Sequence, residues 1–227
     1  MKIVITGCSQ GIGKKISNYL SKDFDVVGIS RRPLNSKKFK SLKCDILMND
    51  EIYKTFKKIK KFDVLINCAG ISHYSENVLE NFDKILKTNL YGSFFCSYNA
   101  LKYLRKSANP SIINISSINA YQAFPNNPGY VASKGGLNSL TRSLALDYAK
   151  YKIRVNSISP GYIREGMAEK SFKNKKLNRD RKLKTMLNRW GKAEDLFGII
   201  DYLINKKSKY VTAQDFVIDG GWINKGL

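Results

Sequence analysis

Short apolar runs alternate with helix-length segments from one end of the chain to the other. The runs that predict strands are residues 3–6, 25–30, 42–45, 63–67, 111–116, 154–159 and 216–218. Helical spacing marks a segment that ends near residue 20, then residues 49–60, 81–105 and 128–149. Nearly continuous apolar strands are typical of a parallel sheet covered by helices on both faces. The sequence therefore predicts an α/β fold, doubly wound around a seven-stranded parallel sheet.

The length of 227 residues suits one large domain. A chain of this size buries enough apolar surface to fold without disulfides or structural metal ions, so residues 1–227 are expected to form a single domain. Residues 164–189 break the regular pattern and are heavily basic. We expect this segment to form a mobile helical lid over the crevice at the carboxyl ends of the strands.

The cysteines, at positions 8, 44, 68 and 96, form no C-x-x-C pair. This spacing favours neither a metal site nor a disulfide framework, and it fits a reducing compartment. The first residues enter a predicted strand at once, which leaves no room for a signal peptide. No apolar run approaches the ~18 residues that a membrane span needs. We therefore expect a soluble cytoplasmic protein with no membrane partner.

The charge is strongly positive, with 40 Lys and Arg against 18 Asp and Glu, a formal net charge of +22. A lysine-rich composition that decorates every solvated face is one explanation. Attraction to a phosphorylated ligand, an acidic carrier protein or a nucleic acid is the other. The chain lacks the aromatic and basic pattern of single-strand binding proteins, so nucleic acid is the less favoured partner.

A glycine-rich turn follows the first predicted strand and opens the first predicted helix. Its residues are Thr6-Gly7-Cys8-Ser9-Gln10-Gly11-Ile12-Gly13. Glycines here permit a tight turn and let a pyrophosphate approach the backbone, while the start of the helix supplies N–H donors. The pattern predicts a dinucleotide site, and a turn without a ligand is the alternative.

The same turn contains G-x-S-x-G, the pattern around the nucleophile of α/β hydrolases. That interpretation requires an acid and a histidine later in the chain, with the histidine near its end. The one histidine is His73, and several further strands and helices are predicted after it. The sequence therefore disfavours a hydrolase and also the histidine-dependent dehydrogenases.

Tyr130 and Lys134 are four residues apart in a predicted helix, so both side chains lie on one helix face. A free tyrosine has a pKa near ~10, and a neighbouring ammonium lowers it. Tyr130 can then give a proton to a carbonyl or take one from an alcohol. Ser117, at the end of a predicted strand, can hydrogen-bond the reacting oxygen. An ordinary solvated helix pair is the alternative.

With these residues, the chain resembles the short-chain dehydrogenase/reductase family along nearly its whole length. The matching motifs are the turn from Thr6 to Gly13, Asn67-Cys68-Ala69-Gly70, Thr88-Asn89-Leu90, Pro160-Gly161, Arg189-x-Gly191-x-x-Glu194-Asp195 and Asp219-Gly220-Gly221. The resemblance implies a Rossmann fold and hydride transfer between a nicotinamide and a carbonyl carbon. The implied catalytic residues are Asn89, Ser117, Tyr130 and Lys134. In this set, Asn89 holds a water and Lys134 also binds the nicotinamide ribose.

The second predicted strand ends in Ser30-Arg31-Arg32, with no acid to hold the ribose hydroxyl of NAD(H). Two cations suit a 2′-phosphate, so we expect NADP(H) rather than NAD(H); two surface arginines are the alternative. The cofactor contacts expected in total are Gly7, Ser9, Gln10, Gly11, Ile12, Gly13, Ser30, Arg31, Arg32, Asp45, Ile46, Asn67, Ala69, Gly70, Tyr130, Lys134, Pro160, Gly161 and Ile163. Two residues depart from the family pattern. Gln10 stands where many NADP-preferring members have a cation, and Glu165 stands where a threonine is common.

The sequence thus predicts an NADP(H)-dependent oxidoreductase acting on a carbonyl or a secondary alcohol. The expected lid carries a set of cations: Lys170, Lys173, Lys175, Lys176, Arg179, Arg181, Lys182, Lys184 and Arg189. They favour an anionic small-molecule or carrier-bound substrate, nominally a 3-oxoacyl thioester of acyl carrier protein. A nucleotide-linked sugar, a small ketone, or a dinucleotide-sensing or nucleic-acid-binding protein without turnover are the alternatives. The family resemblance implies a homotetramer or homodimer.

Overall fold

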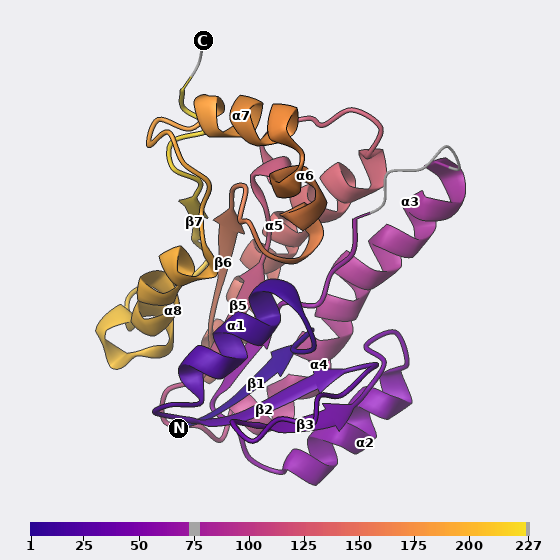
Figure 1. Cartoon of the computed structure of the whole chain (residues 1–227). Helices are drawn as coiled ribbons and strands as arrows, with labels where there is room; N and C mark the ends of the chain where they lie inside the picture. Colours follow the sequence, from indigo (N-terminus) through magenta and orange to yellow (C-terminus); the bar gives the residue numbers. More distant parts are fainter. Residues whose placement is uncertain (73–77, 226–227) are drawn as a thin grey trace.

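The computed structural model describes residues 1–72 and 78–225, and its strands form one parallel sheet (Figure 1). The strands are β1 Lys2–Thr6, β2 Asp25–Ser30, β3 Lys40–Lys43, β4 Val64–Asn67, β5 Ser111–Ile115, β6 Arg154–Pro160 and β7 Asp215–Ile218. Their order across the sheet is β3-β2-β1-β4-β5-β6-β7. This arrangement confirms the predicted fold class. His73 and its neighbour Tyr74 lie outside the described residues.

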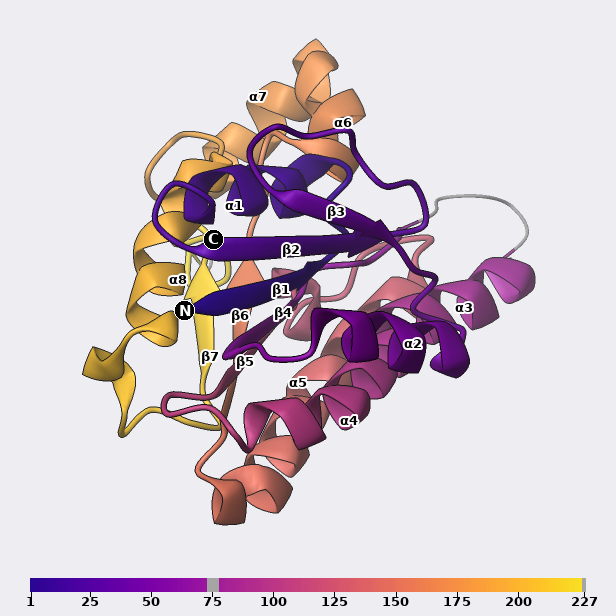
Figure 2. The same cartoon turned by 90° about the horizontal axis from the view of Figure 1, so that it is seen from below.

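Helices cover both faces of the sheet (Figure 2). They are α1 Gly11–Leu20, α2 Asn49–Ile59, α3 Val78–Leu86, α4 Gly92–Leu104, α5 Pro128–Tyr148, α6 Glu169–Lys173, α7 Lys175–Lys184 and α8 Phe197–Ile204. Helices α1 and α8 lie on one face, and α2, α4 and α5 lie on the other. Within the described residues, no helix combines the length and the apolar character needed to cross a membrane.

Each face of the sheet has its own hydrophobic core, because successive strand residues point to opposite sides. In β1, Ile3 and Ile5 pack in the core under α1 and α8, whereas Val4 packs in the core under α2, α4 and α5. All three are fully buried. This two-sided burial explains why the strands are continuous apolar runs in the sequence.

Three elements differ from the sequence prediction. The strand expected at residues 42–45 is β3, Lys40–Lys43, and its polar side chains at the sheet edge give no apolar pattern to mark its start. The helix expected at 81–105 is interrupted by a π-helical turn, Lys87–Tyr91. Helix α8 was not predicted. Residues 164–189 contain α6 and α7 and are helical as expected, while their mobility remains a prediction.

Because the strands are parallel, their carboxyl ends all lie along the same side of the sheet, which is called the carboxyl-terminal edge below. Strand β1 lies between β2 and β4. The connection from β1 to β2 passes through α1 on one face of the sheet, whereas the connection from β3 to β4 passes through α2 on the other face. Such a switch point leaves a crevice at the strand ends, the usual ligand position in open α/β sheets. The motifs singled out in the sequence follow the ends of β1, β2, β4, β5 and β6 and therefore meet at this edge.

Candidate active site

The glycine-rich turn after β1 depends on the absence of side chains. Gly7 and Gly11 have φ angles of +73° and +53°, in the left-handed region that favours glycine. A Cβ on Gly7 would lie 2.7 Å from Ala69 Cα, and one on Gly13 would lie 2.3 Å from the Gly7 carbonyl oxygen. Helix α1 starts here without a side-chain cap from Gln10 and without an acid in its first turn. Its first N–H groups and positive dipole end are thus available to an anion.

The turn is tied to the end of β4 by hydrogen bonds. Thr6 Oγ1 accepts from the backbone N–H groups of Cys68 and Ala69, each at 3.0 Å. The buried Asn67 amide donates to Asn114 Oδ1 on the neighbouring strand β5 at 2.9 Å. These bonds hold the glycine-rich turn against the Asn67-Cys68-Ala69-Gly70 segment. They thereby fix the width of the crevice at the ends of β1 and β4.

The segment after β2 carries the cations expected to select the cofactor. Ser30 is buried and donates from Oγ to the Arg32 carbonyl at 2.7 Å, which fixes the backbone there. Arg31 and Arg32 are exposed, and neither forms an ion pair with an acid of the described residues. Asp45 accepts from Leu47 N at 3.0 Å through its side chain. That Arg31, Arg32 and Asp45 contact a cofactor remains a prediction.

Asn89 lies in the π-helical turn Lys87–Tyr91 and is fully buried. Its Oδ1 accepts from Ile71 N at 2.8 Å, and its Nδ2 donates to the Ile71 carbonyl at 2.9 Å and to Ser133 Oγ at 3.1 Å. Ser133 Oγ in turn donates to the Tyr130 carbonyl at 2.8 Å. Asn89 therefore links the loop after β4 to the first turn of α5. Such π-helical turns are frequent at functional sites. That Asn89 holds a water remains a prediction.

Lys134 is buried, and its ammonium lies at the end of β5. Nζ donates to the Ile115 carbonyl at 2.8 Å and lies 5.6 Å from the centre of the half-buried Tyr130 ring. Gly70 borders the same space, because a Cβ there would lie 3.8 Å from Nζ. Burial lowers the pKa of Lys134 to about 8. Cys68 gives it no counter-charge, since burial raises the pKa of that thiol to about 12.

Ser117 follows β5 and caps the short 3₁₀ helix Ile118–Ala120. Its Oγ accepts from Asn119 N at 3.2 Å and donates to Asn119 Oδ1 at 3.1 Å. To donate to another oxygen, the Ser117 hydroxyl must leave Asn119 Oδ1. Asn119 thus orients this hydroxyl, a role with no signal in the sequence.

The segment after β6 closes this edge of the sheet from the other side. Gly161 N donates to the Ile218 carbonyl at 2.9 Å, and Ile163 pairs with Gly191 in a parallel bridge. The carboxylate of Glu165 accepts from Ala193 N at 3.2 Å. At the position where a threonine is common, this structure therefore has an acid that binds a neighbouring segment of the protein.

Gly166 lies directly against the glycine-rich turn. A Cβ on Gly11 would come within 3.2 Å of Gly166 Cα, and Gly166 itself has a φ of +67°. The segment that leads into α6 thus touches the start of α1. Two glycines in contact let the backbones approach this closely.

The expected site residues divide into two groups. Asn89, Tyr130, Lys134 and the N-x-A-G segment meet where β4, β5 and α5 converge, and Ser117 follows two residues after the Ile115 carbonyl that Lys134 binds. Arg31, Arg32 and Asp45 lie apart from them, beyond the ends of β2 and β3. The side chain of Ile46 is buried against Gly92, and its cofactor contact remains a prediction. Thr6 and Ser133 were absent from the expected set, because their roles come from contacts between distant segments.

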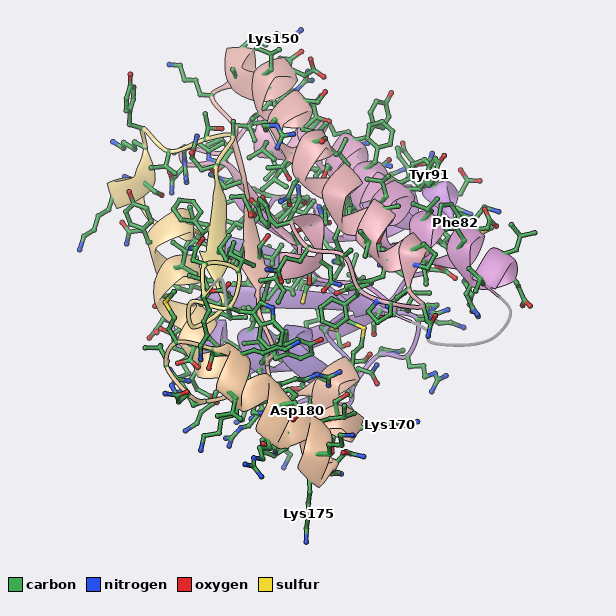
Figure 3. The ribbon with its side chains drawn as sticks, turned by 90° about the horizontal axis from the view of Figure 1, so that it is seen from above. Phe82, Tyr91, Lys150, Lys170, Lys175 and Asp180 are labelled. Carbon is green, nitrogen blue, oxygen red and sulfur yellow. The ribbon has the colours of Figure 1, made fainter. Side chains whose placement is uncertain are left out.

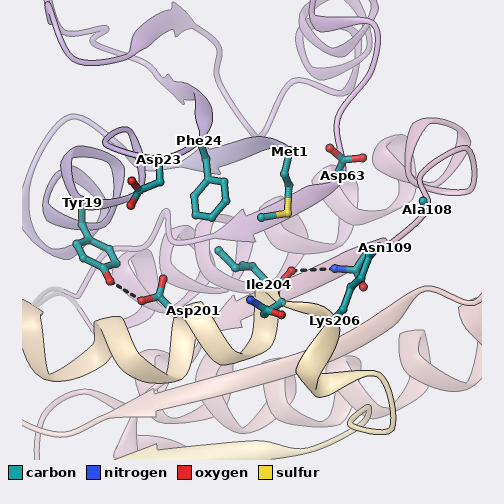
Figure 4. A pocket seen from close by; sticks show the side chains of 11 residues that line it. Met1, Tyr19, Asp23, Phe24, Asp63, Ala108, Asn109, Asp201, Ile204 and Lys206 are labelled. Atoms are coloured by element: carbon teal, nitrogen blue, oxygen red, sulfur yellow. Dashed lines mark hydrogen bonds between the residues drawn. The ribbon is translucent and has the colours of Figure 1, made fainter.

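A hollow of about 670 Å³ lies at the other end of the strands, beside the residues that precede β1, β4 and β5 (Figure 4). None of the expected site residues lines it, and its wall includes the carboxylates of Asp23, Asp63 and Asp201. Asp63 accepts from Lys2 N at 2.8 Å and from Ser107 Oγ at 2.6 Å, and Asp201 accepts from the Tyr19 hydroxyl. An acidic wall repels an anionic dinucleotide, so this hollow is not the cofactor site.

Comparisons with known proteins agree with this geometry. The family profile described as enoyl-(acyl carrier protein) reductase matches residues 9–223. The chain is 32% identical over 234 residues to the 3-oxoacyl-(acyl-carrier-protein) reductase FabG of Rickettsia felis, with 97% of this chain and 95% of that protein covered. It is 30% identical over 239 residues to the 2-dehydro-3-deoxy-D-gluconate 5-dehydrogenase of Bacillus subtilis, covering 98% and 94%.

Solved structures give the same result. The structure described as ElxO with NADP bound has a TM-score of 0.88 to this chain at 28% identity, and 99% of each chain is covered. The likeness extends over the whole sheet and both helix layers rather than over one motif.

The buried ammonium of Lys134 makes stability depend on pH. Below pH 8 the folded protein holds a desolvated cation, whereas above the ordinary lysine pKa of 10.5 neither state is charged. Stability of the wild type should therefore rise with pH between 8 and 10.5, relative to Lys134→Met, by about 3 kcal/mol. Urea unfolding of both proteins at pH 7.5 and pH 10.5 measures this difference.

The matched control is Lys106→Met, which removes an exposed lysine and should show no such pH-dependent difference from the wild type. Parallel pH dependences for the wild type and Lys134→Met would contradict the assignment of a buried charge.

Proposed function

Because the chain belongs to the short-chain dehydrogenase/reductase family of oxidoreductases, we propose that it uses NADP(H) to interconvert a carbonyl and a secondary alcohol on an anionic substrate. The observation that carries this proposal is the position of Lys134. Its buried ammonium lies 5.6 Å from the centre of the Tyr130 ring and bonds to the end of β5, two residues before Ser117. The non-enzymatic alternatives give no reason to bury a cation there.

The residues present fit a dinucleotide with a 2′-phosphate. The uncapped start of α1 and the glycines at 7, 11 and 13 would hold the pyrophosphate, because no side chain occupies that space. Arg31 and Arg32 would bind the 2′-phosphate as charge-assisted donors. Similar structures are described with NADP bound and with NADH bound, so the choice of NADP(H) over NAD(H) rests on Arg31 and Arg32. When bound, the nicotinamide supplies or accepts a hydride.

Tyr130 is the proton donor and acceptor in this proposal. During reduction its hydroxyl gives a proton to the carbonyl oxygen, and during oxidation its phenolate takes the alcohol proton. The Lys134 cation favours the phenolate and is itself favoured by it, which offsets the cost of its burial. The Ser117 hydroxyl turns from Asn119 Oδ1 to the reacting oxygen and stabilises its negative charge. Asn89 positions Tyr130 through Ser133.

Two classes of anionic substrate have support. The similarity to a 3-oxoacyl-(acyl-carrier-protein) reductase favours a 3-oxoacyl thioester on an acidic carrier. The similarity to a 2-dehydro-3-deoxy-D-gluconate 5-dehydrogenase favours a small sugar acid. Both suit α6 and α7, where Lys170 and Lys175 point away from the body of the protein (Figure 3). These exposed cations attract either class of anion.

Self-association and location complete the proposal. Tyr91, at the end of the π-helical turn, and Phe94 and Tyr98 of α4 form an exposed aromatic stripe, which supports assembly into a homodimer or homotetramer. A cytoplasmic location remains a prediction from the cysteine pattern.

Replacement of the proposed proton donor tests the reaction. Tyr130→Phe should lower kcat/KM for NADPH-dependent reduction by about 100- to 10,000-fold, since the ring remains and only the proton is lost. A panel of oxo acids, 3-oxoacyl thioesters and neutral ketones, followed by NADPH absorbance, measures it. The Kd for NADPH should stay within about twofold of the wild type. Tyr91→Phe, which changes an exposed ring, should behave as the wild type. Full turnover by Tyr130→Phe would refute the proposed role.

The cofactor preference rests on two side chains. The double variant Arg31→Ala, Arg32→Ala should weaken NADPH binding by about 10- to 100-fold and leave NADH binding unchanged, because only NADPH carries the 2′-phosphate. Fluorescence titration with each dinucleotide measures both constants. Arg105→Ala, an exposed arginine after α4, is the control. If the double variant lost equal affinity for NADPH and NADH, the arginines would not bind the 2′-phosphate.

A further inference from the structure

Five aromatic rings form a connected cluster beside the candidate active site: Phe124, Tyr162, Phe172, Trp190 and Trp222. The centre of the Tyr162 ring lies 5.8 Å from Phe124, 5.4 Å from Trp190 and 4.9 Å from Trp222. Phe124 lies in the segment between β5 and α5, which also carries Ser117. Tyr162 follows the Pro160-Gly161 turn at the end of β6. The cluster therefore adjoins the strand ends where the substrate carbonyl is proposed to lie.

Two cations of α7 lie over rings of this cluster, Arg181 and Lys184, and the Nζ of Lys184 is 5.6 Å from the centre of the Trp222 ring. The guanidinium carbon of Arg181 is 4.3 Å from the centre of the Tyr162 ring and 5.9 Å from that of Trp190. Arg181 and Asn178 are the two residues of α7 that are not exposed. The backbone carbonyl of Asn178 accepts from Trp190 Nε1 at 3.2 Å, and its side-chain amide donates to the Phe172 carbonyl at 2.7 Å, so this side of α7 faces the rings. Arg181 is the half-buried cation of this basic helix, whereas Lys184 lies over Trp222 but is exposed.

Arg181 has unused hydrogen-bonding capacity. Its Nη1 is buried and has no hydrogen-bond partner in the described part of the chain. No acid of the described residues forms an ion pair with it. Stacking on the rings engages the flat face of a guanidinium and leaves the N–H groups at its edge free. A buried donor without a partner is unfavourable, so the arrangement favours an anion that supplies the missing acceptor.

A carboxylate matches this donor best. A guanidinium presents parallel N–H groups in one plane, and a carboxylate accepts two of them in the same plane. The surrounding rings exclude water and thereby strengthen the pair. A thioester or a neutral sugar offers no charged acceptor to this edge.

We propose that Arg181 binds the carboxylate of the substrate, which identifies the substrate as a small hydroxy acid or oxo acid. This inference rests on the proposed function and narrows it, because it places the anion on the reacting molecule rather than on a carrier. Arg181 is then a residue that determines specificity, and the outward cations of α6 and α7 serve only general attraction.

Tryptophan fluorescence can report ligand binding at this cluster. Trp190 and Trp222 are the only two tryptophans of the chain, so its tryptophan fluorescence arises beside Arg181. Every protein in this titration carries Tyr130→Phe to prevent turnover to NADPH, and the one with Arg181 intact is called the wild type here. Each is first saturated with NADP⁺, whose oxidised ring does not absorb the emitted light. It is then titrated with D-gluconate and 3-hydroxybutyrate, and with their neutral counterparts D-glucitol and 3-hydroxybutyramide. Inorganic phosphate is titrated as a further probe.

The wild type should give a saturable fluorescence change with at least one of the acids and a much weaker response to its neutral counterpart. Arg181→Met keeps an unbranched apolar chain on the rings and should weaken acid binding by about 10- to 100-fold. Arg181→Lys should retain part of the affinity for the acid, since the positive charge is kept but the two parallel N–H donors of the guanidinium are lost. Arg179→Met, on the exposed face of the same helix, should match the wild type.

Four results would overturn the proposal. A wild type that binds NADP⁺ but responds to no acid excludes the carboxylate site and leaves the proposed function standing. Equal weakening of acid and neutral ligands in Arg181→Met would mean that Arg181 only packs α7 onto the rings. A stronger response to phosphate than to the acids would assign the site to phosphorylated substrates. Failure of the wild type to bind either NADP⁺ or NADPH would overturn the proposed function together with this inference.

Discussion

The buried ammonium of Lys134 is the interaction on which the candidate site depends. A cation without a carboxylate partner among the described residues is costly in a protein interior. Lys134 donates a hydrogen bond to the Ile115 carbonyl, and the Tyr130 ring is its aromatic neighbour. This cost is unexplained by stability alone. It becomes intelligible if negative charge develops next to Lys134, which is what a phenolate does during proton transfer.

The sheet brings this cation to its position. Parallel strands place the ends of β1, β4, β5 and β6 at one edge, and the switch at β1 opens the crevice there. Glycines at 7 and 13 permit contacts that a side chain would forbid, and Thr6 ties the turn to the end of β4. The π-helical turn at Asn89 then connects this edge to α5. Backbone geometry, rather than any single side chain, therefore sets the distances within the site.

Much of this could be predicted from the sequence, because it depends on local patterns. Apolar runs indicated the strands, and the i, i+4 spacing of Tyr130 and Lys134 placed both on one face of α5. The π-helical turn could not be predicted, since residues 81–105 keep an ordinary helical pattern. The roles of Asn119 and Ser133 depend on hydrogen bonds in the folded chain. Edge strand β3 was misplaced because its side chains are largely polar.

Arg181 illustrates the same limit. In the sequence it is one of nine cations between residues 170 and 189, with nothing to distinguish it. Only the packing of α7 against Tyr162 and Trp190 separates it from its exposed neighbours. The net charge of +22 therefore includes both solvated surface cations and Arg181, a half-buried cation that stacks on aromatic rings.

The most direct test of the central claim is the titration of Tyr130 itself, followed by ultraviolet difference absorbance between the wild type and Tyr130→Phe. We expect the difference to reveal one tyrosine that ionises while Lys134 is still charged, with a pKa below the ordinary value of about 10, and Lys134→Met to return that pKa toward the ordinary value. A Tyr130 pKa at or above 10 that does not respond to the loss of Lys134 would contradict the account.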